Sequence, residues 1–167
     1  MNTKHRNITL IASLLISATL MANEEDTFAG VSAGYTHLNV EQTNRTGAII
    51  LGNTIEEDGY NFQIQAGYNY SQTIALTLNY QRVHQDDTHL DNFFLGSEYK
   101  FQLINKFTPY IGANLGYSKL NWDHKPMNTT NNDISSGSWL IGVTAGVSYP
   151  IAPKLDLQVG YTLQLTD

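Results

Sequence analysis

The segment that decides the fold is YNFQIQAGYNY, residues 60–70. Its even-numbered positions are Tyr, Phe, Ile, Ala, Tyr and Tyr, and its odd-numbered positions are Asn, Gln, Gln, Gly and Asn. Successive side chains of a β-strand point to opposite faces of the sheet. The segment is therefore predicted to be a strand with one apolar face and one neutral polar face.

The same alternation recurs six more times after residue 26 and predicts further strands. These lie at about 29–36, 74–81, 93–102, 109–118, 139–149 and 155–166. Short turns at 71–72, 104–106 and 151–153 alternate with long polar stretches at about 41–59, 83–91 and 120–136. Tight turns on one side and long loops on the other are typical of transmembrane barrels, whose long loops lie outside the cell. The first of these strands then starts in the periplasm and the seventh ends outside. Residues 48–51, which do not alternate, are predicted to be an extended hairpin tip or a loop anchor, with strand structure as the alternative.

The polar faces of these strands distinguish a membrane barrel from a soluble sheet. The polar face of a soluble sheet meets water, whereas here the only charged residues on it are Glu98, Lys100 and Asp156. The remaining residues are small or neutral and suit the interior of a narrow barrel. Because charges in such an interior must pair, we predict interior ion pairs among these three residues.

The aromatic residues of the apolar faces fall toward both ends of the strands, with Ile, Leu, Val and Ala between them. This distribution predicts two aromatic girdles at the membrane surfaces. The predicted girdle residues are Tyr60, Phe62, Tyr68, Tyr70, Tyr80, Phe93, Tyr99, Phe101, Phe107, Tyr117, Trp139 and Tyr149. The fold class is thus all-β, an antiparallel up-and-down transmembrane β-barrel of the bacterial outer membrane.

Closure of the barrel requires an additional strand. Unpaired backbone groups cost several kcal/mol each in hydrocarbon, and single-chain bacterial barrels have even strand numbers. Seven strands are visible in the sequence, so we expect eight in all. The eighth is expected after Asp167, one long loop beyond the end of this sequence.

The N-terminus is predicted to be a secretory signal peptide, residues 1–22, leaving residues 23–167 as the barrel domain. A basic start, Lys4-His5-Arg6, precedes an uncharged and mostly apolar run at 8–21. The run is shorter than the roughly 20 apolar residues of a membrane-spanning anchor, which is the alternative. Cleavage is expected after Ala22, although Leu20 stands where a smaller residue is more usual. Export then passes through the periplasm.

The segment TPYIGANLGY, residues 108–117, resembles a recurrent strand of the outer-membrane β-barrel domain family that includes the OmpA and OmpX membrane domains. The Gly-Tyr pairs at 34–35, 67–68, 116–117 and 160–161 support the resemblance, which covers residues 27–167. It implies an interior ion-pair network of the kind associated with plugging or gating. Structural pairing is the simpler interpretation of the same charges. The family includes structural anchors and adhesins, so the resemblance indicates the fold more strongly than the function.

Composition and motifs exclude several function classes. A net charge of −6 without clustered Lys and Arg argues against nucleic acid, and zero cysteines exclude disulfides and Cys-based metal sites. A rim-sited hydrolase, acyltransferase or metal site would use residues of the predicted loops, but no nucleophile motif or ligand spacing supports one. We therefore predict no catalytic residue, metal or cofactor. The loop residues considered are His84, Asp86, Asp87, His89, Asp123 and His124.

The favoured function is a structural or surface-interaction role through the extracellular loops, and the protein is not expected to be an enzyme. A narrow porin-like channel is the alternative, although a lumen filled with Gln, Asn and Tyr argues against it. The expected partners are outer-membrane lipid, lipopolysaccharide and an extracellular ligand or host surface, with the protein itself a monomer. Basic side chains near the outer rim are expected to meet lipopolysaccharide phosphates, namely Arg45, Arg82, Lys119 and Lys125.

Overall fold

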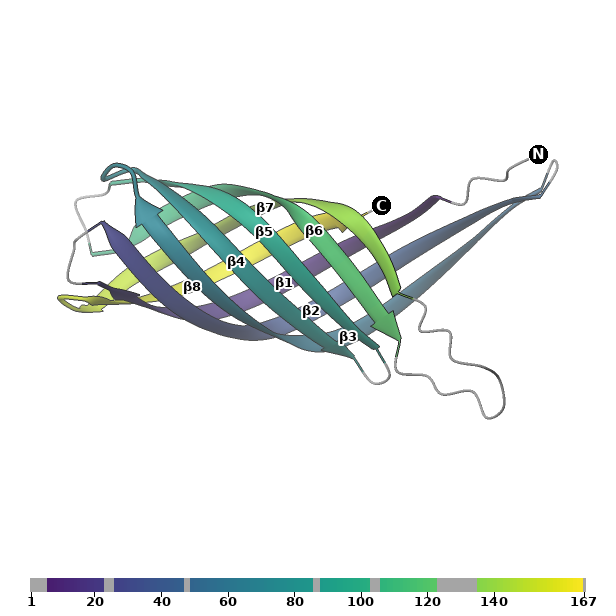
Figure 1. The fold of residues 1–167 in the computed structure, drawn as a ribbon, viewed down its shortest axis with the longest axis horizontal. Helices are drawn as coiled ribbons and strands as arrows, with labels where there is room; N and C mark the ends of the chain where they lie inside the picture. Colours follow the sequence, from purple (N-terminus) through teal and green to yellow (C-terminus); the bar gives the residue numbers. More distant parts are fainter. Residues whose placement is uncertain are drawn as a thin grey trace.

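The computed structural model describes residues 6–22, 26–46, 49–85, 88–102, 106–122 and 135–166. They form a closed antiparallel barrel whose strands follow one another in sequence order, with the first and last paired (Figure 1). The strands are β1 (Arg6–Met21), β2 (Thr27–Thr46), β3 (Ile49–Asn69), β4 (Ile74–Gln85), β5 (Thr88–Lys100), β6 (Thr108–Trp122), β7 (Ser135–Ala152) and β8 (Leu155–Thr166). No helix in these ranges is long and apolar enough to cross a membrane, a finding that does not bear on strands.

The predicted number of eight strands is confirmed, but the position of the eighth strand was wrong. It is β1, which lies within the predicted signal peptide, and not a segment after Asp167. β1 pairs with sixteen residues of β2 and with twelve residues of β8, so it closes the barrel from both sides. Cleavage after Ala22 stays a prediction, and it would remove this strand.

β1 fits the barrel because its own side chains alternate. Leu14 and Ile16 face outward and are exposed, whereas Ser13 and Ser17 face inward and are buried. The hydroxyl of Ser13 lies 2.9 Å from that of Thr36 on β2 and shares a hydrogen bond with it. The apolar outer face suits lipid, and the inner hydroxyl groups suit the neutral interior.

Two of the predicted long loops are largely strand. β2 and β3 remain paired up to Thr46 and Ile49, and β4 and β5 up to Gln85 and Thr88. The ladders continue because backbone pairing between antiparallel neighbours does not depend on the alternation that the membrane imposes. Within the segment 48–51, expected to be a hairpin tip, residues 49–51 form the start of β3, and Figure 1 shows the β2–β3 hairpin projecting beyond the barrel. Most of the third loop, residues 123–134, lies outside the described residues.

The connections define the two ends of the barrel. Short turns join β1 to β2, β3 to β4, β5 to β6 and β7 to β8 at one end. The hairpins after β2, β4 and β6 lie at the other end, where β1 begins and β8 finishes. We call the first the short-turn end and the second the hairpin end. By the rule that the long loops of such barrels face outward, the hairpin end is expected to be extracellular.

Candidate functional site

The middle of the barrel interior is filled by side-chain amides and hydroxyls from β3 to β5. The Gln63 amide donates to Asn79 Oδ1 over 3.0 Å, and the Asn79 amide donates to Thr77 Oγ1 over 2.9 Å. The Asn92 amide donates to Gln81 Oε1 over 3.0 Å. All five side chains are buried. The inner face predicted as neutral and polar is thus a hydrogen-bonded network.

The network continues on the opposite wall of the barrel. The Asn114 amide donates to Thr144 Oγ1 over 2.8 Å, and this hydroxyl lies 3.0 Å from that of Thr162. We call the two groups together the amide layer. The cavity between its side chains is about 30 Å³, which suffices for one or two water molecules. This cavity is too small for a hydrated solute.

A cluster of apolar side chains lies in the interior nearer the hairpin end. Ile11, Leu38, Val83 and Leu90 are buried against one another and form what we call the apolar plug. They come from β1, β2, β4 and β5, and because β2 and β4 are not neighbours, the cluster spans the lumen. Sequence reasoning missed it, since two of its members fall in a predicted polar loop and another in the predicted signal peptide.

Aromatic rings cover inward-facing glycines nearer the short-turn end. Phe28 lies opposite Gly67, and a Cβ added at that glycine would collide with the Phe28 ring. Tyr110 extends over Gly146 and Gly160 on the next two strands, where added Cβ atoms would lie about 2.5–2.6 Å from its ring or hydroxyl. This close approach gives a physical reason for two of the Gly-Tyr pairs: the glycine admits a ring inside, while the following tyrosine faces outward.

We call Phe28 and Tyr110 the aromatic layer, and the predicted interior charges occupy inward strand positions near it. Glu98 lines the small central cavity. The Lys100 ammonium donates to Asn69 Oδ1 over 3.0 Å and lies 5.4 Å from the centre of the Phe28 ring. Asp156 is half-buried at the start of β8. Ion pairing among Glu98, Lys100 and Asp156 stays a prediction, since these contacts do not test it.

Ten of the twelve predicted girdle residues are exposed on the outside of the barrel, while Tyr80 and Tyr149 are half-buried there. Neighbouring rings contact one another near each end. At the hairpin end the pairs are Tyr80–Phe93 and Tyr117–Trp139, with ring centres 4.7 and 6.5 Å apart. At the short-turn end they are Tyr99–Phe101 and Phe107–Tyr149, 5.1 and 5.0 Å apart. Their contact with the membrane surfaces stays a prediction.

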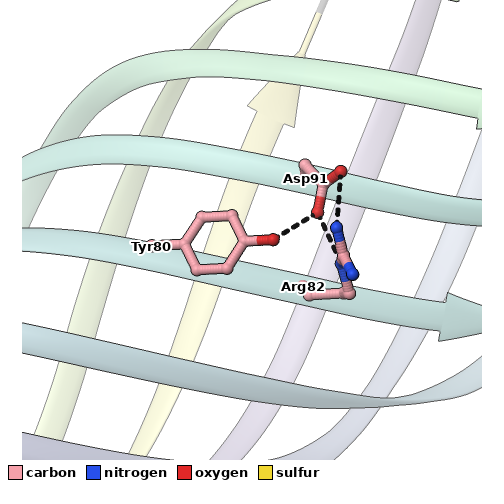
Figure 2. Close-up of polar contacts among 3 residues, drawn as sticks. All are labelled: Tyr80, Arg82 and Asp91. Carbon is pink, nitrogen blue, oxygen red and sulfur yellow. Dashed lines mark hydrogen bonds and ion pairs between the residues drawn. The ribbon is translucent and has the colours of Figure 1, made fainter.

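An ion pair joins β4 to β5 just beyond the aromatic pairs of the hairpin end (Figure 2). Arg82 donates to the two carboxylate oxygens of Asp91 over 2.7 and 3.2 Å, and the Tyr80 hydroxyl donates to the same carboxylate over 2.7 Å. Burial alone would raise the pKa of Asp91, but the hydrogen bonds from Arg82 and Tyr80 and the Arg82 charge outweigh it and lower this pKa. The Arg82 side chain remains 53% exposed. Such a pair orders the rim more than it stabilises the fold.

A second pair joins β2 to β3. His37 Nδ1 lies 2.7 Å from Asp58 Oδ1, and hydrogen bonds from His37 and then Tyr35 lower the pKa of Asp58. His84 and His89 are opposite each other across β4 and β5. Asp86, Asp87, Asp123 and His124 lie outside the described residues. Among the side chains that the structure does describe, no three His, Cys, Asp or Glu residues gather as metal ligands would.

The comparisons with known proteins concern the fold. No curated protein matches the chain significantly. The crystal structure of Neisserial surface protein A is similar over 96% of this chain and 97% of that chain, with 16% identity and a TM-score of 0.52. The N-terminal β-barrel domain of Pseudomonas aeruginosa OprF is similar over 98% and 100%, with 14% identity and a TM-score of 0.43. A family model described as "Outer membrane protein beta-barrel domain" matches residues 8–167, which include most of β1. The chain therefore belongs to this family of outer-membrane β-barrel domains.

Proposed function

We propose that this protein is a non-conducting barrel of the outer membrane that presents its β2–β3 hairpin as an interaction surface outside the cell. The observation that carries the proposal is the closed interior: the apolar plug, the amide layer and the aromatic layer succeed one another along the lumen. A barrel closed in this way is a scaffold and not a conduit. Its function then depends on the parts that extend into the surroundings.

The β2–β3 hairpin is the largest of these parts. From the Tyr35–Tyr60 pair at the aromatic girdle of the hairpin end, the β2–β3 ladder continues for eleven more residue pairs to Thr46 and Ile49. At a rise of about 3.3 Å per residue this is roughly 36 Å along the strand. The sequence of this extension mixes acidic residues, Arg45 and the apolar run 48–51. A segment of this mixed composition suits an extracellular ligand or a host surface.

Cysteine labelling tests the placement of this hairpin, and the chain has no cysteine of its own. Thr43→Cys, in the hairpin extension, is expected to react with a membrane-impermeant maleimide on intact cells. Gln72→Cys, in the turn between β3 and β4, is the matched control and is expected to react only after the outer membrane is permeabilised. Labelling of Gln72→Cys but not Thr43→Cys on intact cells would contradict the proposal.

Planar-bilayer recording separates this proposal from a narrow channel. The heat-modifiable, folded protein is expected to give no conductance steps, because the cavity in the amide layer holds only one or two water molecules. A matched preparation of detergent alone sets the baseline. Reproducible steps that disappear when the plug residue Leu38 is enlarged to Trp would favour the channel.

The remaining parts of the proposal concern the rim and export. Arg82 and Lys119 lie on the outward face beyond the aromatic girdle of the hairpin end, where we propose that they meet lipopolysaccharide phosphates. We further propose that the protein is monomeric, that it is not an enzyme, and that its N-terminal segment directs export. Membership of an outer-membrane family supports the location, and the pairing of Arg82 and His37 with carboxylates supports a structural rim.

A further inference from the structure

The outer surface of β5 to β8 contains a hollow of about 520 Å³. Its volume falls within the range of pockets that bind small molecules, roughly 300–1,000 Å³. The lining comes from four neighbouring strands, and nearly all of it is apolar. The outward-facing members are Ser97, Tyr99, Ile111, Ala113, Val143, Ala145, Tyr161 and Leu163.

Side-chain size explains why the surface is hollow here. Ser97 lies opposite Ala113, and Ala145 lies opposite both Ile111 and Tyr161, so small residues form the floor. The next outward row toward the hairpin end consists of large, exposed side chains, and this row forms one wall. Its members are Leu95, Leu115, Ile141 and Leu165. Tyr99 and Tyr161 line the hollow on β5 and β8.

The position of the hollow indicates what fills it. It continues the apolar outward face that, in an outer-membrane barrel, contacts hydrocarbon. On β5 the hollow begins one outward row from Leu95 toward the short-turn end, and it includes Tyr99 of the aromatic pair at that end. It therefore lies in the periplasmic half of the apolar outer face. An acyl chain in a hollow contacts protein on more sides than a chain on a flat surface, and such packing is the main source of affinity within a bilayer.

We propose that this hollow binds one acyl chain of a phospholipid of the periplasmic leaflet. The chain packs on Ala113 and Ala145 between the walls of larger side chains. The phenol group of Tyr99, in the aromatic pair at the short-turn end, is suited to hydrogen-bond the ester or headgroup oxygens, as tyrosines at membrane surfaces commonly do. Tyr161 lies two outward rows further from that end than Tyr149, so its ring packs on the acyl chain instead. This assigns the β5–β8 face a lipid-holding role that is independent of the hairpin and of the closed lumen.

Native mass spectrometry of the full chain tests the proposal, with dioleoyl phosphatidylethanolamine added to the detergent micelles as the probe. The folded wild type is expected to retain one phospholipid at a collision energy that strips the rest. Ala113→Leu/Ala145→Leu fills the hollow with apolar groups and is expected to reduce that retained fraction at least tenfold. Ala29→Leu/Ala33→Leu, an equal enlargement on the outward face of β2, is the matched control and is expected to retain the lipid.

Heat-modifiable gel mobility shows whether each variant is folded, and the smaller change Ala145→Val serves if Ala113→Leu/Ala145→Leu does not fold. Equal retention in all variants would overturn the proposal, because the lipid would then bind elsewhere. Absence of retained lipid from the wild type would also overturn it. A wild-type dimer that Ala113→Leu/Ala145→Leu turns into a monomer would assign the hollow to a second copy of the chain instead.

Discussion

Refolded from urea into detergent micelles, the chain of residues 1–167 is expected to migrate as a compact band that shifts only on boiling. The chain of residues 23–167 is expected to show no such shift and to aggregate. Gel mobility of unboiled and boiled samples measures the difference. We expect the heat-dependent shift to be lost completely, because the deletion removes the whole strand β1 and not merely a set of side chains.

The physical reason is the exposure of two sheet edges. β1 contributes sixteen residue pairs with β2 and twelve with β8. Without it, the backbone groups of both neighbours face hydrocarbon, where each unsatisfied group costs several kcal/mol. An open seven-stranded sheet also presents edges that pair with other chains, so aggregation is the expected alternative to closure.

A proline substitution distinguishes loss of the strand from loss of apolar surface. Leu14→Pro in the full chain removes a backbone donor in the middle of β1 and is expected to abolish the heat-dependent shift. Leu14→Ile keeps the outward apolar side chain and is the matched control. A synthetic peptide of residues 6–21 is expected to restore the shift to the 23–167 chain. If the 23–167 chain shifts as the full chain does, β1 is dispensable for closure.

The same segment carries the prediction of a cleaved signal peptide, and the two roles exclude each other within one molecule. A mature protein that starts at Asn23 cannot contain β1. The intact mass of the protein extracted from outer membranes distinguishes the two cases. Retention of residues 1–22 would make β1 the closing strand in the cell, and their loss would leave the positions beside β2 and β8 to another strand.

Seven of the eight strands could be predicted from sequence because lipid and a narrow lumen impose opposite demands on alternate residues. In the segment 60–70, Phe62 and Ile64 must meet hydrocarbon while Asn61 and Gln63 must pair inside. This rule ends where the strands leave the membrane. Residues 41–46 and 49–59 therefore carry no clear alternation, although they continue the same ladder, and they fall within the loop predicted at about 41–59.

The reason why β1 and the apolar plug could not be predicted from the sequence is different. In β1, Ser13 and Ser17 mark the inward face, but Ile11 and Leu15 share it, so the run reads as uniformly apolar. The inward Ile11 makes sense only beside Leu38, Val83 and Leu90. These residues come together through the register of non-adjacent strands, which local periodicity does not contain.

Gly160→Val is expected to destabilise the wild-type barrel by about 1–3 kcal/mol and to be neutral or stabilising when Tyr110 is replaced by Ala. A Cβ at Gly160 would lie 2.5 Å from the Tyr110 hydroxyl, so in the wild type the ring must leave its place over the glycine. Tyr110→Ala alone is expected to cost about 3–5 kcal/mol, because it empties a buried aromatic site. In that background the valine occupies the vacated space and contributes its strand preference.

Urea unfolding followed by the fluorescence of Trp122 and Trp139 measures the four free energies of this double-mutant cycle. Gly30→Val is the matched control, because an added Cβ there meets Gln65 and Thr19 at 3.0 Å and not Tyr110. Its cost is expected to be the same with and without Tyr110. Equal costs of Gly160→Val in both backgrounds would show that Tyr110 does not pack on Gly160. A strong coupling would show that these inward glycines are retained for the ring they accommodate, since glycine otherwise weakens a strand.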